Sequence, residues 1–330
     1  MHFSRRIVVE FGVALPGRGP LAKPDIVLRL ATRADAFRYD SIFVTDHVVL
    51  PASMARSVYP YSTTGQFAGG AAQDYLEPLA TLGYLAHATK RVRLGTSVLV
   101  VPYRNPLVAA KTLATIDQLS GGRVILGAGV GWLREEFDAL AAPAFEARGA
   151  VTDEYLRLMR ATWTVDPVTF EGKHYRVRDV HALPKPAQRG GIPIWIGGHT
   201  DGALKRAGTL GDAWHPIGLR PPAMLLPDEY AQKVKQIHAW AQRAGREPSA
   251  IRLTLRAPME VRPKGTKAGG GSRPLLQGTA AEVAADLQQY VALGVSHFVF
   301  DPTVPDVKAV LANLERFADE VRPKLKRVRA

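Results

Sequence analysis

An aspartate and a histidine stand where a predicted strand ends. Residues 41–45 form an apolar run that predicts a buried strand, and Asp46 and His47 follow it directly. At the carboxyl end of a parallel strand, a histidine can give or take a proton near neutral pH, or hydrogen-bond a carbonyl substrate. A packed histidine with internal hydrogen bonds is the alternative. We take His47 as the candidate catalytic residue.

Two later segments have the composition of anion-binding turns. Gly197, Gly198 and His199 follow one predicted strand and open a helix, and Ile217 and Gly218 follow the next strand. Backbone N–H groups at such helix starts bind anions, phosphate above all. Each segment alone could be an ordinary strand-to-helix turn. Together, on neighbouring strands, they predict a phosphate cradle.

A third glycine-rich segment covers residues 127–131 (GAGVG) and matches a dinucleotide fingerprint only loosely. Its third glycine, Gly131, comes one residue early for G-x-G-x-x-G, and Trp132 stands where that motif needs a small residue for helix packing. We therefore expect these glycines to let the backbone approach a flat ligand.

The sequence gives little support for a metal site or for acyl-transfer chemistry. None of the nine histidines forms an H-x-H or H-E-x-x-H spacing, and the chain has no cysteine, so we expect no protein-built metal site. G-x-S-x-G is also absent, which leaves acyl transfer without an obvious nucleophile.

Composition narrows the range of partners. The 330 residues carry a net charge of +13, which could suit nucleic acid, an anionic surface or a polyanionic small ligand. The arginines are scattered, with no basic motif interleaved with aromatics, so we expect no nucleic-acid partner. No apolar run approaches the roughly 18 residues of a membrane span, and no signal peptide is recognisable. We expect a cytoplasmic protein that does not engage a membrane.

The candidate residues are positioned by an alternation of strands and helices. Strands are predicted at residues 7–15, 41–45, 92–100, 123–126, 192–196, 212–215, 251–260 and 296–300, with helical segments between them. Such alternation indicates a parallel sheet, and eight units in this length predict an α/β fold, a (β/α)8 TIM barrel with insertions. A doubly wound sheet is the alternative.

Three segments interrupt this single domain of residues 1–330. Residues 48–74 form a long connection with Tyr59, Tyr61 and Phe67, which favours a lid-like insertion over disorder. Residues 168–177 predict a small hairpin within an insertion at 165–190. Residues 263–274 are glycine-rich and predict a flexible loop.

Taken together, these motifs resemble the bacterial luciferase-like monooxygenase superfamily, in particular its branch of coenzyme F420-dependent oxidoreductases. The resemblance runs in family order over roughly residues 7–300. The matching segments are SIFVTDH (41–47), YLEPLATLGYLAHA (75–88), RVRLGTSVLVVPYRNP (91–106), LSGGRVILGAGVGW (119–132), residues 135–137, the hairpin of residues 170–175, PIWIGG (193–198) and GDAWHP (211–216).

The resemblance implies a (β/α)8 barrel that holds a flavin or deazaflavin at the carboxyl ends of its strands. It implies a cis non-proline peptide bond at Ser97-Val98, beside the cofactor ring. His47 matches the active-site histidine of F420-dependent sugar and alcohol dehydrogenases. The implied ring contacts are Asp46, Ser97, Val98, Val130 and Gly131. The implied phosphate contacts are main-chain groups of Gly197, Gly198, His199, Ile217 and Gly218.

One position departs from the family pattern. F420-dependent sugar dehydrogenases have a glutamate directly after the glycine loop, where this chain has Trp132, so sugar oxidation with that acid is doubtful. We assign Trp132 to the substrate side. Glu135 and Glu136 stand about one helical turn further on and are expected to lie short of the ring.

The resemblance implies an enzyme that transfers hydride between F420 and an unknown small organic substrate, with His47 as proton donor or carbonyl anchor. The basic surplus suits a cofactor with a phosphodiester and an oligoglutamate tail. An FMN-dependent monooxygenase that uses O2 and a separate reductase is the alternative, and a non-catalytic flavin- or F420-binding protein is the second alternative. The expected partners are a small-molecule substrate, a second copy in a homodimer, and a flavin or F420 reductase that supplies reduced cofactor.

Overall fold

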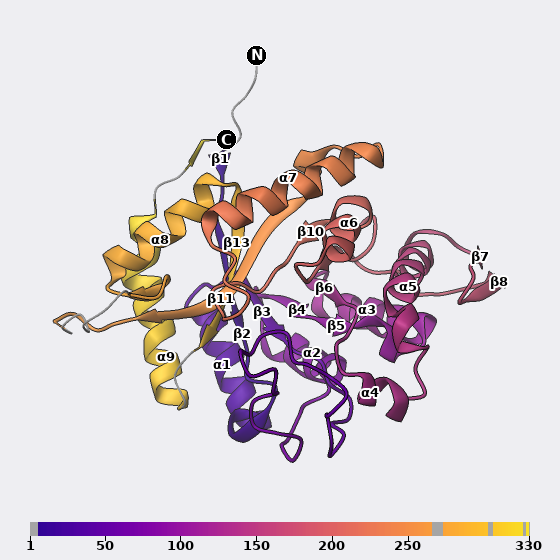
Figure 1. Cartoon of the computed structure of the whole chain (residues 1–330), viewed down its shortest axis with the longest axis horizontal. Coiled ribbons are helices and arrows are strands. Elements are labelled where there is room, and N and C mark those ends of the chain that lie inside the picture. Colours follow the sequence, from indigo (N-terminus) through magenta and orange to yellow (C-terminus); the bar gives the residue numbers. More distant parts are fainter. Residues whose placement is uncertain (1–5, 266–272, 303–305, 326–327, 330) are drawn as a thin grey trace.

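Eight parallel strands close into a barrel, in the order in which they occur along the chain (Figure 1). The computed structural model describes residues 6–265, 273–302, 306–325 and 328–329. Strand β10 pairs with β11 and β13 pairs with β2, which closes the ring. The barrel strands are β2 (Glu10–Ala14), β3 (Ser41–Val44), β4 (Arg93–Thr96), β6 (Val124–Gly129), β9 (Ile194–Ile196), β10 (Ala213–Trp214), β11 (Arg252–Val261) and β13 (Val295–Pro302). The predicted (β/α)8 barrel is confirmed, and the doubly wound alternative is wrong.

Helices cover the outside of the barrel. They are α1 (Pro24–Ala36), α2 (Pro78–Ala88), α3 (Pro106–Ser120), α4 (Arg134–Ala139), α5 (Arg148–Thr164), α6 (Asp201–Thr209), α7 (Pro227–Arg243), α8 (Ala280–Ala292) and α9 (Val307–Arg316). Short 3-10 turns lie at Gly19–Leu21, Val101–Tyr103, Phe145–Ala147, Pro248–Ala250 and Arg322–Lys324, and a π turn at Phe317–Val321. Local sequence sets several ends. Asn105 caps α3 by accepting the amides of Leu107 and Val108, and Gly121 ends it in the left-handed conformation at φ 70°.

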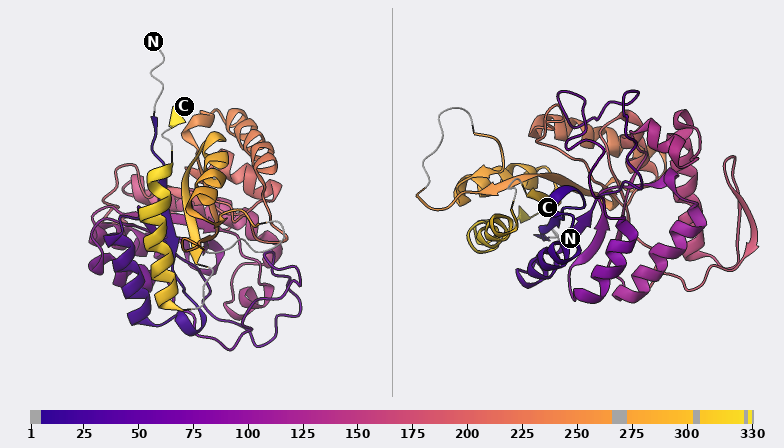
Figure 2. Two further views of the ribbon diagram at one scale, coloured as in Figure 1. Left: turned by 90° about the vertical axis from the view of Figure 1, so that its left-hand side faces the viewer. Right: turned by 90° about the horizontal axis from the view of Figure 1, so that it is seen from below.

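Some strands lie outside the barrel. β1 (Arg6–Ile7) pairs with β14 (Val328–Arg329), β5 (Leu99–Val100) lies beside β6, and β12 (Gln277–Gly278) lies beside β11. The predicted hairpin is confirmed as β7 (Val168–Glu171) and β8 (Arg176–Val180), which projects at the edge of the molecule beyond α5 (Figures 1 and 2). The predicted loop at 263–274 falls largely on residues 266–272, which lie outside the described residues.

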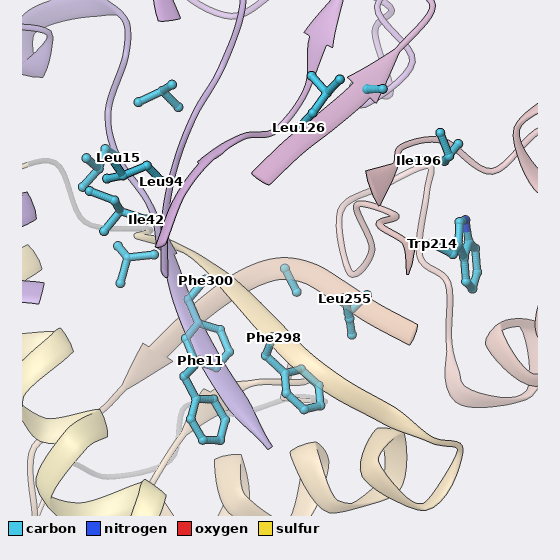
Figure 3. Close-up of a cluster of buried hydrophobic side chains, with 14 of the residues drawn as sticks. Phe11, Leu15, Ile42, Leu94, Leu126, Ile196, Trp214, Leu255, Phe298 and Phe300 are labelled. Carbon is cyan, nitrogen blue, oxygen red and sulfur yellow. The ribbon is translucent and has the colours of Figure 1, made fainter. Parts of the chain in front are cut away.

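Alternate side chains of each strand enter two apolar layers. Phe11, Phe298 and Phe300 face the helices and gather on β2 and β13 (Figure 3). Val299, between the two phenylalanines of β13, belongs instead to a cluster made only of strand residues, with Phe43 and Trp195. Since neighbouring side chains of a strand point to opposite faces, the first layer lies between barrel and helices and the second fills the barrel.

Three of the predicted strands have different boundaries in the structure. The strand predicted at 7–15 begins only at Glu10 as part of the barrel. The strand predicted at 92–100 is divided into β4 and β5, and the cis peptide bond Ser97-Val98 lies between them. The strand predicted to end at Leu126 continues to Gly129, so two of the glycines read as a loop are strand residues.

Gly127 is required by the close approach of two strands. A Cβ atom added there would lie 1.9 Å from the carbonyl oxygen of Thr96, a backbone atom that cannot move freely. We expect Gly127→Ala to destabilise the protein by about 3 kcal/mol or more, since overpacking against backbone costs more than the usual range. Thermal unfolding would measure this as a lowered midpoint.

Gly83 provides the matched control within α2, because an added Cβ there meets nothing within 4 Å. Gly83→Ala should leave stability unchanged or raise it by up to about 1 kcal/mol, the gain in helix propensity. Equal stability of Gly127→Ala and the wild type would contradict this assignment.

Candidate active site

A cavity of about 980 Å³ opens at the carboxyl ends of the barrel strands. It is lined by residues that follow β3, β4, β6, β9 and β10, and by much of the 48–74 segment, which forms no helix or strand. That segment lies at the opposite end of the barrel from β1 (Figures 1 and 2). All of the residues predicted as site residues except Gly218 line this cavity.

His47 is held by a buried carboxylate. Its Nδ1 lies 2.5 Å from Oε2 of Glu136, and the two side chains are 7% and 0% exposed. An ionised carboxylate can only accept, so Nδ1 carries the hydrogen of this bond. Nε2 of His47 has no protein hydrogen-bond partner among the described residues, and His47 lines the cavity. The geometry leaves Nε2 as the nitrogen that can meet a ligand.

Glu136 has every acceptor position occupied. Oε1 accepts the amides of Val48 at 2.7 Å and Val49 at 3.2 Å, and Oε2 also accepts the hydroxyl of Tyr103 at 3.0 Å. Burial raises the pKa of Tyr103, and the Glu136 charge raises it further, so this hydroxyl remains a donor. Glu136 therefore joins the start of the 48–74 segment to the histidine.

Glu136 was expected to lie short of the cofactor ring, and it does not line the cavity. Sequence reasoning did not predict its bond to His47. The available signal was a carboxylate at the start of a short helix directly after β6, next to the buried Phe137. The neighbouring Glu135 binds the same segment, since it accepts the amide of Arg56 at 2.7 Å and the hydroxyl of Ser57 at 2.6 Å.

Asp46 supports the backbone after the cis bond. Its carboxylate pairs with Arg104 at 2.7 and 2.9 Å and accepts the amide of Val100 at 2.8 Å. Burial raises the pKa of the Asp46 carboxyl, while Arg104 acts in the opposite direction. Asp46 reaches the cavity wall as expected, but its oxygens are engaged by these protein groups.

The cis peptide bond at Ser97-Val98, expected from the resemblance, is confirmed. The Val98 side chain lies between two glycines. A Cβ atom added to Gly129 would lie 2.4 Å from the Val98 side chain, and one added to Gly197 would lie 2.7 Å from it. These glycines therefore make room for Val98. Val98, Val130 and Gly131 line the cavity.

A polar network fixes Ser97 from behind. Its hydroxyl lies 2.8 Å from Nε2 of His215 and 3.0 Å from Arg256, which also donates to the Ser97 carbonyl. Burial lowers the pKa of His215, and Arg256 acts in the same direction, so His215 is neutral. Arg256 pairs with Asp301 at 2.7 Å. Sequence reasoning missed Arg256, although a charged residue inside the apolar run of β11 was a usable signal.

The expected phosphate cradle needs a correction. The amide of Gly197 donates to the Ala128 carbonyl at 3.0 Å, and that of Gly218 donates to the Arg256 carbonyl at 2.8 Å. Both N–H groups are used by barrel pairing and are not available to a ligand. Within the described chain, the amides of Gly198, His199 and Ile217 have no protein acceptor, and these residues line the cavity.

Two features that favour an anion line the same cavity as those amides. Helix α6 begins just after His199, with Thr200 as its N-cap, and its first turn lines the cavity. Arg148, at the start of α5, also lines the cavity and has no carboxylate partner within the described chain. Burial lowers the pKa of His199, so its neutral ring adds no charge. Helix N-termini and an unpaired guanidinium suit an anion such as a phosphate.

Aromatic rings enclose the entrance to His47. The centroids of Phe67, Tyr75 and Trp132 lie 5.2, 5.1 and 5.9 Å from the His47 ring. Phe67 comes from the 48–74 segment, which thus forms part of the cavity wall. Whether this segment opens and closes as a lid remains a prediction.

Over the described ranges, no helix combines the length and apolar character needed to cross a membrane. In the same part of the chain, no group of three or more His, Cys, Asp or Glu side chains is arranged to hold a metal ion.

Sequence comparison identifies relatives. A family model described as luciferase-like monooxygenase matches residues 7–269. An uncharacterized protein of Mycobacterium tuberculosis is 32% identical over 210 residues, which cover 63% of this chain and 69% of the relative. An F420-dependent glucose-6-phosphate dehydrogenase of Amycolatopsis mediterranei is 34% identical over 194 residues, 58% of this chain and 53% of the relative. The match therefore spans about half of that dehydrogenase.

Solved structures share the fold. Monooxygenase RslO1 from Streptomyces bottropensis has a TM-score of 0.76 at 21% identity, over 95% of this chain and 99% of that one. An F420-dependent secondary alcohol dehydrogenase, in complex with an F420-acetone adduct, has a TM-score of 0.75 at 21% identity, over 96% and 99%. The FMN-bound oxygenating constituent of 3,6-diketocamphane monooxygenase from Pseudomonas putida scores 0.74 at 15% identity, over 97% and 99%. At these identities the likeness establishes the fold alone.

Proposed function

Because this chain belongs to the luciferase-like monooxygenase family and is an oxidoreductase that uses F420 or a flavin, we propose that it transfers hydride between F420 and a small organic substrate. The observation that carries the proposal is the His47–Glu136 pair at 2.5 Å, on the wall of the cavity at the carboxyl ends of the strands. Hydride transfer to a carbonyl needs one proton, and a histidine protonated on both ring nitrogens, with Nδ1–H held by a carboxylate, can supply it from Nε2.

The cavity fits such a cofactor. A flat ring would lie against Val98, Val130 and Gly131, where Gly129 and Gly197 keep the backbone close. A phosphate would be held by the amides of Gly198, His199 and Ile217 and by Arg148. The net charge of +13 suits a polyanionic tail. When bound, the deazaflavin supplies or accepts the hydride.

The protein supplies position and a proton. Glu136 accepts the hydrogen of Nδ1 and thereby fixes the orientation of the His47 ring. Nε2 of His47 then holds the proton that passes to the substrate. Aromatic side chains around His47 exclude water from this transfer. Asp46 and Arg104 hold the backbone that carries Val98 toward the ring.

An FMN-dependent monooxygenase is the second candidate. The same free amides and Arg148 suit the phosphate of FMN, and the apolar enclosure of His47 suits chemistry that must exclude water. This alternative requires O2 and a separate flavin reductase. The cytoplasmic location, the homodimer and the reductase that supplies reduced cofactor, all expected from the sequence, belong to the proposal in either form.

Titration of the purified protein with F420 and with FMN, followed by cofactor fluorescence, tests the choice. We expect saturable binding of F420 that is tighter than binding of FMN. Arg148→Ala should weaken F420 binding about tenfold, the loss of about one charge-assisted hydrogen bond. Arg178→Ala, on the exposed hairpin with an 82% exposed side chain, should change nothing.

Three outcomes would contradict the proposal. Tight FMN binding with no response to F420 would assign the protein to the monooxygenase class. Binding of neither cofactor would show that the cavity is not a site for F420 or FMN. Binding of F420 without any hydride transfer to candidate substrates would leave the non-catalytic alternative.

A further inference from the structure

We infer that the substrate is an uncharged ketone or aldehyde with an aromatic or alicyclic body, selected by an aromatic wall made of Tyr59, Phe67 and Trp132. This inference rests on the proposed function, because it names the substrate class of the same site.

The aromatic wall is continuous beside the proton-bearing histidine. The Tyr59 ring centroid lies 5.2 Å from that of Phe67 and 5.0 Å from that of Trp132, and Phe67 and Trp132 are 5.6 Å apart. Two members of the wall also contact the His47 ring, Phe67 at 5.2 Å and Trp132 at 5.9 Å. The aromatic wall therefore forms the part of the cavity next to His47, where a group that meets Nε2 would contact it.

The wall leaves apolar surface uncovered. All three side chains line the cavity and are only half-buried, unlike the aromatic residues of the core. Contiguous apolar surface in a concave site indicates a ligand that covers it. Aromatic rings bury large apolar areas and pack well against flat or alicyclic groups.

The carboxylates of the cavity cannot serve a polyhydroxylated substrate. Each one that lines it is paired with an arginine: Asp46 with Arg104 at 2.7 Å, Glu146 with Arg134 at 2.5 Å and Asp301 with Arg256 at 2.7 Å. No Asn, Gln or Lys occurs among the described residues that line the cavity. Sugar hydroxyls bound here would find chiefly neutral hydroxyl groups, such as those of Tyr59 and Tyr61, in place of the free carboxylates, amides and ammonium groups that bind polyhydroxylated ligands more strongly.

The cations nearest the wall are also engaged. The Arg18 guanidinium lies 4.4 Å from the Phe67 ring centroid and donates to the Ala68 carbonyl at 2.8 Å. Arg56 pairs with Asp138. An anionic substrate would have to displace these contacts, whereas an uncharged one would not. Arg148, which like Arg18 has no carboxylate partner among the described residues, belongs to the anion cradle proposed for the cofactor.

The chemistry balances for a carbonyl group. The carbonyl carbon takes a hydride, with its two electrons, from reduced F420. The C=O π bond breaks, and the oxygen takes the proton from Nε2 of His47. The products are an alcohol and oxidised F420, and neutral His47 regains a proton from solvent. No acid other than His47 is required.

Isothermal titration calorimetry with two probes tests the inference. Acetophenone represents the uncharged aromatic carbonyl, and glucose 6-phosphate represents a polyhydroxylated anion. Each is titrated into the full chain with and without saturating oxidised F420. We expect acetophenone to bind and glucose 6-phosphate not to bind. Phe67→Ala should weaken acetophenone binding about tenfold, a loss typical of truncating one aromatic contact.

Tyr84 on α2 supplies the matched control, because its aromatic side chain is 49% exposed and does not line the cavity. Tyr84→Ala should bind acetophenone as the wild type does. Tighter binding of glucose 6-phosphate than of acetophenone, absent acetophenone binding, or equal affinity of the Phe67→Ala and Tyr84→Ala variants would each overturn the inference.

Failure of the inference and failure of the proposed function give different results. If F420 binds but acetophenone does not, the substrate class is wrong and the cofactor assignment survives. If acetophenone binds in a Phe67-dependent manner but F420 does not bind, the cofactor assignment is wrong and the aromatic wall remains a substrate site.

Discussion

Replacement of His47 by alanine should lower turnover by about 10²- to 10⁴-fold, the range typical for loss of a general acid or base. The dissociation constant of F420 should change by no more than a few-fold. The reason is spatial: His47 contacts Glu136 and the surrounding rings, whereas the free amides of Gly198, His199 and Ile217 lie after other strands. Steady-state rates of F420 conversion and fluorescence titration measure the two quantities separately.

A second variant guards against loss of the fold. His47→Ala leaves the buried carboxylate of Glu136 without its Nδ1–H donor, so instability alone could reduce activity. His47→Asn keeps a side-chain donor near the position of Nδ1 but lacks Nε2. We expect it to unfold near the wild-type temperature and to be as inactive as His47→Ala. His87→Ala, on the exposed side of α2, is the control with full activity. Unchanged turnover in either His47 variant would remove this residue from the mechanism.

Glu136→Gln should lower turnover by about 10²-fold or more, because a wrong or uncharged partner of the imidazole is costly in other histidine–carboxylate pairs. The amide side chain has nearly the same shape, and its oxygen can still accept from Val48 and Val49, while its NH2 group takes the Oε2 position and donates to the Tyr103 hydroxyl and to His47. An NH2 group donates where the carboxylate accepted, so Nδ1 of His47 must become the acceptor of this bond. The hydrogen of the neutral ring then moves to Nε2, and the tautomer is reversed. We expect kcat to fall while KM and F420 affinity change little.

Comparison with the Glu136→Ala variant separates the effect of Glu136 on the His47 ring from its contribution to stability. This variant removes the acceptor of four donors, including the amides of Val48 and Val49, in a site where the carboxylate is 0% exposed. Breaking a buried pair of this kind costs about 3–5 kcal/mol, so a large fall in thermal stability is expected. Glu136→Gln should lose far less stability than Glu136→Ala. The exposed Glu315→Gln serves as control for both. If Glu136→Gln retains full kcat, Glu136 has only a structural role.

The architecture was predictable because its determinants are local. Apolar runs at eight places, helices between them, and caps such as Asn105 and Gly121 all act within a few residues of themselves. The parallel barrel follows from that alternation, since parallel strands need helical crossovers. Strand ends were less predictable. β6 continues through Gly127 and Gly129, where neighbouring atoms leave no room for a side chain, and this crowding exists only in the folded barrel.

The candidate site was predictable in part. His47 and the Ser97-Val98 bond stand at strand ends that are visible in the sequence, and both lie on the cavity. The sequence did not show which backbone N–H groups are free to bind a ligand. Gly197 and Gly218 look like ligand donors by composition, but closure of the barrel pairs their N–H groups with the carbonyls of Ala128 and Arg256.

The sequence by itself determined that the chain is a barrel with a histidine at the mouth, because residue type and periodicity act over short distances. Only the tertiary structure decided which groups meet there. His47 and Glu136 are 89 residues apart, and Ser97 and Arg256 are 159 apart, so their contacts exist only once the ring of strands has closed. Closure also engages the carboxylate oxygens of Asp46, and among the described residues it leaves Nε2 of His47 and the amides of Gly198, His199 and Ile217 without a protein partner. The physical reason is that a barrel brings the ends of distant strands to one rim, where the charges and donors that remain unpaired form the site.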